Sequence, residues 1–128
     1  MRLLLDTHAF LWWVQDAREL SKKARAAIAD PENECRLSLV SCWEMAIKQS
    51  LGKLRLPTSI ERFIPEQLAS NRFHQLGIEF RHVTRVAALA FHHRDPFDRL
   101  LAAQALEEGL AVVSSDAVFR QYGVKRIW

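Results

Sequence analysis

The sequence has few of the features that define several other protein classes. It contains only two cysteines, Cys35 and Cys42, which form neither a C-x-x-C pair nor a zinc-ligand spacing with histidine. We therefore expect two free thiols in a reducing compartment, rather than a disulfide framework or a zinc finger. Internal repeats and low-complexity segments are also missing, which argues against a repeat protein or a disordered chain.

Long apolar runs are absent as well. The longest, such as residues 3–5 and 110–113, are far shorter than the roughly 20 residues that cross a bilayer. The first residues lack the basic start, apolar stretch and cleavage site of a secretory signal peptide. We therefore expect no membrane partner and a cytoplasmic location.

The composition that remains is that of a globular protein. Hydrophobic residues make up 49% and charged residues 26% of the 128 residues. This length suits a single domain with a sizeable core, so we expect one domain spanning residues 1–128. The net charge is +3, and most of the 18 basic residues are arginine. Because arginine favours bidentate contacts with phosphate, a nucleic-acid partner is plausible on this ground, although the charge alone does not identify one.

Short apolar runs alternate with helical patterns along the chain. Strands are expected at residues 2–5, 36–40, 110–115 and 124–128, with a further short strand within 76–83. Helices are expected near residues 10–14, 22–30, 41–52, 58–73, 84–93, 95–109 and 117–123. Alternating strands and helices indicate parallel strands joined by right-handed crossovers. The predicted fold is therefore α/β, a three-layer α/β/α sandwich with a central, mostly parallel twisted sheet.

Four acidic residues occur where such a fold places its ligands. Asp6 and Asp116 end apolar runs, Glu44 follows another, and Asp98 begins a helix. Ligands of open parallel sheets bind beyond the carboxyl ends of the strands. Carboxylates gathered there would raise one another's pKa values unless a cation compensates, and oxygen-only ligation suits Mg²⁺ or Mn²⁺. The pattern thus predicts a metal-dependent phosphoryl-transfer site.

Each carboxylate also has a simpler explanation, since acids at helix N-termini accept hydrogen bonds from backbone N–H groups. Asp6 and Asp116 could each cap a following helix, and Ser41 with Glu44 fits a capping box. If capping were their only role, the protein would be a non-catalytic module that binds nucleic acid or protein.

Four segments together resemble the signature of PIN-domain ribonucleases, and in particular the VapC-like toxins of bacterial toxin–antitoxin pairs. They read LLLDTHAFLWW, SCWEMAIK, DPFDRLLAAQA and VVSSDAVF, and they extend from one end of the chain to the other. The resemblance implies a metal-dependent endoribonuclease that leaves a 5′-phosphate and a 3′-hydroxyl. It also implies a homodimer and a cognate VapB-like antitoxin. A PIN-type nuclease that acts on DNA is the alternative within the same family.

The resemblance also assigns roles to individual residues. One or two Mg²⁺ or Mn²⁺ ions would be held by four acids, with two small polar residues in support. The four acids are Asp6, Glu44, Asp98 and Asp116, and the supporting residues are Thr7 and Ser114.

Other residues near these motifs leave alternatives open. His8 and Arg99 could contact RNA, or they could serve packing, capping or ion pairing. Asp95 is expected to cap a helix rather than to bind metal. The doublet His92-His93 is not expected to bind a transition metal, because adjacent residues on a helix point in different directions.

Apolar side chains offer candidates for interfaces. Tryptophans 12, 13 and 43 could stack on bases, but a place in the core or in a dimer contact is preferred. An expected helix with an internal proline could form a dimer surface, an antitoxin surface or plain core. Its apolar residues are Ile60, Phe63, Ile64 and Leu68.

Overall fold

The fold is built around one sheet of five parallel strands. A computed structural model describes all residues from 1 to 128. The strand order is β3-β2-β1-β4-β5, and every neighbouring pair runs parallel. The strands are β1 Arg2–Leu5, β2 Glu34–Ser38, β3 His74–Leu76, β4 Ala111–Val113 and β5 Arg126–Ile127. The expectation of a parallel α/β fold is confirmed.

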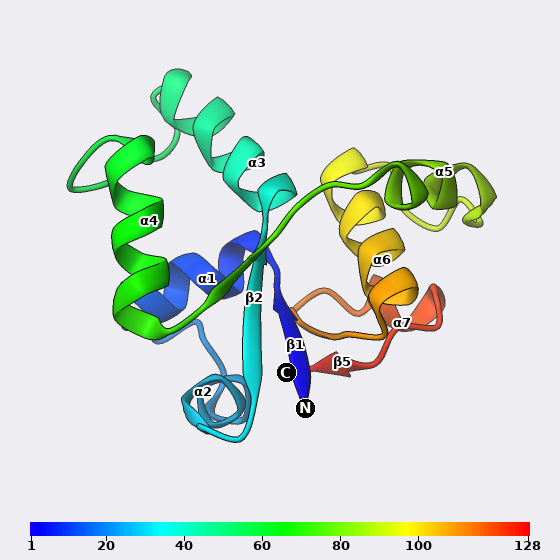
Figure 1. The fold of residues 1–128 in the computed structure, drawn as a ribbon, viewed down its shortest axis with the longest axis horizontal. Coiled ribbons are helices and arrows are strands. Elements are labelled where there is room, and N and C mark those ends of the chain that lie inside the picture. The colour runs from blue at the N-terminus through cyan, green and yellow to red at the C-terminus, as the bar shows by residue number, and fades with distance from the viewer.

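Seven helices cover the sheet on both sides (Figure 1). In this view α1, α2 and α4 lie on one side of the sheet and α5, α6 and α7 on the other, while α3 rises from the end of β2. The helices are α1 Thr7–Val14, α2 Lys22–Ala29, α3 Leu39–Ser50, α4 Ile60–Asn71, α5 Phe80–Ala88, α6 Pro96–Glu108 and α7 Val118–Gln121. None of them is long and apolar enough to cross a membrane.

The central strand β1 divides the core into two parts. Leu3 and Leu5 belong to a cluster of 17 buried residues on the side of α1, α2 and α4. Leu4 points to the other side, into a cluster of 12 buried residues contributed largely by α6 and α7. Side chains alternate between the two faces of a strand, and helices cover both faces of β1. This coverage explains why every residue from Leu3 to Leu5 is apolar. The carboxylate of Asp6 follows where the strand ends.

Burial shows whether the apolar residues of α4 belong to the core or to an interface. Phe63 and Ile64 are buried in the larger cluster, and Ile60 and Leu68 pack against it, so this face of α4 is core. Helix α4 continues through Pro65 without a break into two.

Several boundaries differ from the sequence-based expectation, and two of the differences bear on the site. Helix α3 begins at Leu39, because the hydroxyl of Ser38 accepts a hydrogen bond from the Val40 N–H at 3.0 Å. The proposed capping box of Ser41 and Glu44 is therefore wrong, since both residues lie inside the helix. Glu44 is thus not needed as a cap.

The segment after α4 also differs. Strand β3 ends at Leu76, so residues 77–83 form no strand, and α5 begins at Phe80 rather than near residue 84. The start of α5 is fixed by a cap in which the His82 Nδ1 accepts a hydrogen bond from the Glu79 N–H at 2.9 Å. Histidine is an unusual residue for this role, which explains why the start was missed.

Candidate active site

All four predicted acids line one cleft at the carboxyl ends of the strands. Strands β1 and β4 are neighbours, and the N–H of Asp6 still donates to the Val113 carbonyl at 3.1 Å, so the residues that follow both strands lie together. The N-terminal halves of α3 and α6 supply the remaining acids. The cleft has a volume of about 320 Å³ and no hydrophobic lining residue. It is lined by Asp6, Thr7, His8, Glu44, Lys48, Asp95, Asp98, Ser115 and Asp116.

Asp6 is the most deeply buried of these acids, with 6% of its surface exposed. Its Oδ1 accepts a hydrogen bond from the Ala9 N–H at 2.8 Å and caps α1. Burial raises the pKa of Asp6 from 3.8 to about 6, and the charges of Glu44 and Asp116 add to this rise. Hydrogen bonds from Ser114 and from the Ala9 N–H oppose it. Asp6 is therefore both a cap and a cleft residue.

Glu44 is held by two donors from different elements. The Thr7 hydroxyl donates to the Glu44 Oε1 at 2.7 Å, and the Lys48 ammonium donates to Oε2 at 2.7 Å. Lys48 also lines the cleft, and the sequence reasoning had not singled it out. Its spacing of four residues from Glu44 on one helix was the available signal. These contacts fix the direction of the Glu44 carboxylate.

Asp98 and Asp116 meet at a histidine. The His93 Nε2 lies 3.0 Å from the Asp98 Oδ2 and 3.6 Å from the Asp116 Oδ2. Burial raises the pKa of Asp98 to about 6, and the charge of Asp95 adds to it, while the hydrogen bond with His93 opposes the rise. His93 is thus a further cleft-side residue that the sequence reasoning set aside.

The reason for that omission is structural. Both histidines were expected on a helix, but α5 ends at Ala88 and α6 begins at Pro96, so both lie in the connection. In this irregular segment the rings of the two adjacent histidines contact different parts of the protein. His92 packs edge-on against Tyr122 with ring centres 5.1 Å apart, while His93 reaches the acids.

Arg99 requires a correction. It was a candidate for binding substrate, but it does not line the cleft and only 8% of its surface is exposed. Its guanidinium donates to the Ala90 and Val86 carbonyls at 3.0 and 3.2 Å and lies over the Phe91 ring. These internal contacts use the charged group to hold the connection between α5 and α6.

The remaining candidates lie at the edge or beneath the cleft. Ser114 is buried, and its hydroxyl accepts a hydrogen bond from the Asp116 N–H at 3.0 Å. His8 is exposed and stacks on Trp12 with ring centres 5.3 Å apart. Asp95 caps α6, as expected, by accepting from the N–H groups of Phe97 and Asp98. Its side chain also borders the cleft.

The donor set fits a hard divalent cation. Five carboxylates line the cleft, whereas Lys48 is the only Lys or Arg side chain there. The pKa values of Asp6 and Asp98 are raised to about 6, chiefly by burial and further by neighbouring carboxylates, so the metal-free protein disfavours their charged forms. Oxygen ligands of this kind suit Mg²⁺ or Mn²⁺. Helix capping explains the position of one carboxylate oxygen in some of these acids. It does not explain why all of them line the same cleft.

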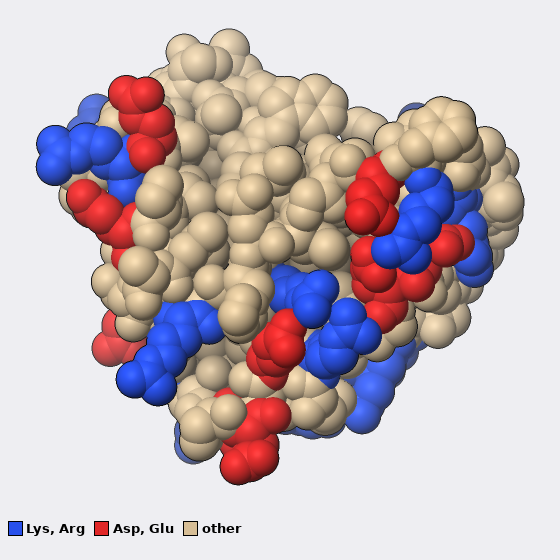
Figure 2. Space-filling view, viewed as in Figure 1, with Lys and Arg blue, Asp and Glu red and all other residues tan.

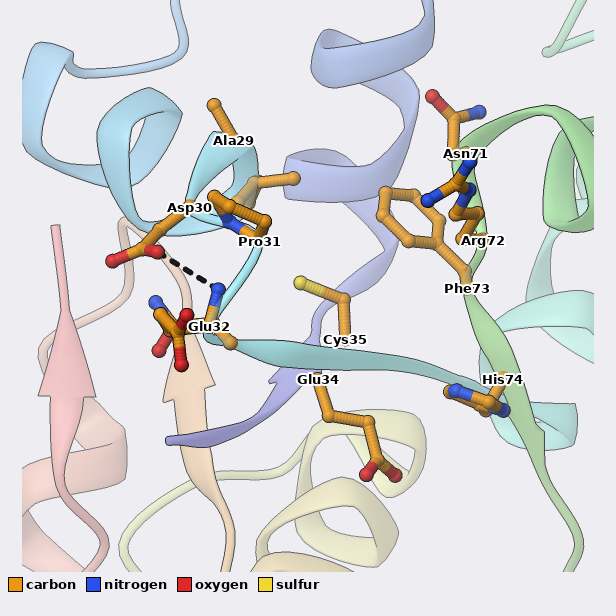
Figure 3. Close-up of a pocket in the computed structure, with 12 residues that line it drawn as sticks. Ala29, Asp30, Pro31, Glu32, Glu34, Cys35, Asn71, Arg72, Phe73 and His74 are labelled. Carbon is orange, nitrogen blue, oxygen red and sulfur yellow. Dashed lines mark hydrogen bonds between the residues drawn. The ribbon is translucent and has the colours of Figure 1, made fainter.

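A second pocket, of about 460 Å³, lies near the amino ends of β2 and β3. Figure 3 shows Cys35 directed into it between Pro31 and Phe73, with Glu34 directed away. The Oδ1 of Asp30 accepts the Glu32 N–H at 2.9 Å and is used by the local turn. This pocket brings together no comparable group of carboxylates, so the acidic cleft is the stronger candidate for chemistry.

Comparison with known proteins agrees with the fold. The family model described as the PIN domain matches residues 3–125. The chain belongs to the PIN-domain family. Ribonuclease VapC22 of Mycobacterium tuberculosis is 30% identical over 121 residues, which cover 94% of this chain and 91% of that protein. This PIN domain is therefore VapC-like, as the motifs indicated.

Solved structures show the same fold at lower sequence identity. The VapBC2 structure from Rickettsia felis, bound to a promoter DNA fragment, contains a chain with a TM-score of 0.69 and 12% identity, with full coverage of both chains. The VapBC-5 structure from Mycobacterium tuberculosis contains a chain with a TM-score of 0.60 and 20% identity, covering 98% of this PIN domain and 97% of that chain.

Proposed function

We propose that this PIN domain is the ribonuclease toxin of a cytoplasmic toxin–antitoxin pair and cleaves RNA internally with the help of divalent metal ions. One observation carries the proposal, which is the convergence of Asp6, Glu44, Asp98 and Asp116 from separate elements into a single polar cleft. The similarity to a ribonuclease of the VapC group supports RNA as the substrate.

The acids have different parts in this proposal. We assign Asp6 and Asp98 as the principal metal ligands, because Asp6 is buried, Asp98 is half-buried, and the raised pKa of each shows that the metal-free protein disfavours the charged carboxylate. Asp116 and Glu44 complete the set. When bound, Mg²⁺ or Mn²⁺ supplies activation of water and stabilisation of charge on the phosphate.

The protein's own contribution is orientation. Thr7 and Lys48 fix both oxygens of Glu44, and Ser114 holds the backbone that carries Asp116. Fixed carboxylates do not need to reorganise when the substrate arrives, which is how such sites lower a barrier. Lys48 also places a positive charge in the cleft, where it can contact a phosphate oxygen of the RNA. Hydrolysis in line leaves a 5′-phosphate and a 3′-hydroxyl.

Two protein partners belong to the proposal, namely an antitoxin of the VapB kind and a second copy of the chain. Relatives have been crystallised in VapBC and FitAB complexes. For the second copy, we favour the face seen in Figure 2, where Lys, Arg, Asp and Glu gather in the lower half and at the two sides, and the upper middle is free of them. Exposed apolar side chains lie on α3 and on the segment that enters α5. They are Trp43, Ile78 and Phe80, which are 54%, 40% and 82% exposed.

The experiment is cleavage of a mixed RNA pool by the purified protein with Mg²⁺ or Mn²⁺, with EDTA as a control. Asp6→Asn and Asp98→Asn are expected to abolish cleavage. Asp16→Asn is the matched control, because Asp16 is an exposed acid that pairs with Arg25 away from the cleft. Equal cleavage by all variants would refute the nuclease assignment. A DNA strand of the same sequence tests the alternative, and preferential DNA cleavage would overturn RNA as the substrate.

A further inference from the structure

His93 brings a nitrogen atom to an otherwise oxygen-lined site. Its Nε2 lies 3.0 Å from the Asp98 Oδ2 and 3.6 Å from the Asp116 Oδ2. One ligand atom from each of these three side chains falls within a span of 4.8 Å. The three residues come from the α5–α6 connection, from α6 and from the segment after β4, so their meeting is a product of the tertiary fold rather than of local sequence.

The spacing suits ligands of one ion. Around an octahedral ion with bonds of about 2.1 Å, adjacent ligand atoms are about 3 Å apart. The two observed separations, 3.0 and 3.6 Å, are close to this edge length. A simple ion pair of His93 with Asp98 would account for the shorter separation. It would not require the same nitrogen to approach Asp116 as well.

The connection that carries His93 is held at both of its ends. Arg99 donates to the Ala90 carbonyl and lies over the Phe91 ring, with 4.6 Å between its guanidinium carbon and the ring centre. These contacts anchor the beginning of the connection, and Asp95 anchors its end as the cap of α6. The imidazole is therefore presented to the acids by a constrained segment, as a preorganised ligand requires.

We propose that His93 is a nitrogen ligand of the metal ion in the acidic cleft and that it makes the site prefer Mn²⁺ to Mg²⁺. Mg²⁺ takes oxygen ligands almost exclusively, whereas first-row transition ions accept imidazole nitrogen. The inference rests on the proposed function, because it requires that the cleft binds a divalent ion. It goes further by naming a ligand outside the four acids and by predicting the choice of metal.

The decisive measurement is pulsed electron paramagnetic resonance of the Mn²⁺-loaded protein, which detects ¹⁴N nuclei bound directly to Mn²⁺. The wild type is expected to show ¹⁴N coupling, and His93→Gln is expected to lose it. Two other histidines provide matched controls. His92→Gln alters the neighbouring ring, and His8→Gln alters the other histidine at the cleft, so both variants are expected to keep the coupling.

Metal affinities give a second readout. Calorimetric titration of His93→Gln is expected to show Mn²⁺ binding weakened by about tenfold or more, the range typical for disturbed metal sites. Mg²⁺ binding should change much less, so that the preference for Mn²⁺ shrinks. Circular dichroism of the variants checks that each remains folded.

The outcomes separate this inference from the proposed function. If Mn²⁺ binds but shows no ¹⁴N coupling, or if the coupling survives in His93→Gln, the ligand assignment is wrong and the nuclease proposal stands. If wild-type protein binds neither Mn²⁺ nor Mg²⁺ while it is folded, both proposals are overturned. Coupling that disappears in His8→Gln alone would transfer the role to His8 and refute the assignment of His93.

Discussion

Replacing Asp6 by asparagine should stabilise the metal-free protein while it destroys the metal site. The pKa of Asp6 is raised from 3.8 to about 6, chiefly by burial, so the folded protein disfavours the charged carboxylate. A shift of about two units corresponds to about 3 kcal/mol of unfavourable free energy once the group is ionised. Asparagine removes that charge and keeps an oxygen that can cap α1 at the Ala9 N–H.

The sign follows from the pKa values in the two states. Well below pH 3.8 the carboxyl group is protonated in both the folded and the unfolded chain, so the charge has no effect on stability. Between pH 4 and pH 6 only the unfolded chain ionises, and the folded wild type loses stability as the pH rises. Above pH 6 the penalty is fully present. Asp6→Asn should therefore match the wild type near pH 3.5 and exceed it at pH 7 by up to about 3 kcal/mol.

The assay is urea denaturation of both proteins at several pH values from 3.5 to 7, with EDTA present. Asp6→Ala is the matched control, because it removes the charge and the cap together and should gain about 1 kcal/mol less than asparagine. In a parallel series at pH 7 with Mn²⁺ in place of EDTA, the metal should stabilise the wild type and leave Asp6→Asn unchanged. A variant that is less stable than the wild type at pH 7, or a difference that does not vary with pH, would refute the reasoning.

Three further predictions concern the cleft and its supports. Mn²⁺ affinity, measured by calorimetry, should fall as the pH drops from 7 to 5, because the pKa values of Asp6 and Asp98 are raised to about 6 and protonated carboxyls do not bind metal; a constant affinity over this range would contradict it. Thr7→Val leaves the Glu44 Oε1 without its donor, so RNA cleavage should fall by roughly tenfold with no change of fold, whereas Thr7→Ser should keep most of the activity. Arg99→Met removes the hydrogen bonds to the Val86 and Ala90 carbonyls, so the free energy of unfolding, measured by thermal unfolding, should fall by roughly 2–4 kcal/mol. An unchanged melting temperature would show that Arg99 does not stabilise the connection between α5 and α6.

The parts of the molecule that could be predicted from sequence are those set by local rules. The apolar run of β1 and the Asp95, Pro96 and Gly109 signals of α6 depend on neighbouring residues, and the structure confirms both. The alternation of strands and helices then determines a parallel sheet. Its topology is sufficient to bring the ends of β1 and β4 together.

What could not be predicted depends on contacts between distant residues. Arg99 was ambiguous because nothing in its vicinity reveals that it would be enclosed by Val86, Ala90 and Phe91. His93 was dismissed because its segment was assigned to a helix. An irregular connection has no periodicity from which the direction of a side chain can be read.

The four-acid pattern presented two explanations, helix capping and metal binding, and one carboxylate has enough oxygen atoms to serve both. Asp6 and Asp116 each accept a backbone N–H with Oδ1, from Ala9 and Val118 respectively. A carboxylate has a second oxygen, and in Asp116 this Oδ2 is the atom that faces His93. A backbone N–H near the start of α1 or α7 thus fixes the orientation of each side chain, and in Asp116 the second oxygen is left facing His93, although the cap position of α7 itself is Ala117. Asparagine keeps one oxygen that can accept the backbone N–H, but it carries an NH₂ group in place of the second carboxylate oxygen. Asp→Asn variants are therefore expected to keep the fold of the site and to lose its metal binding.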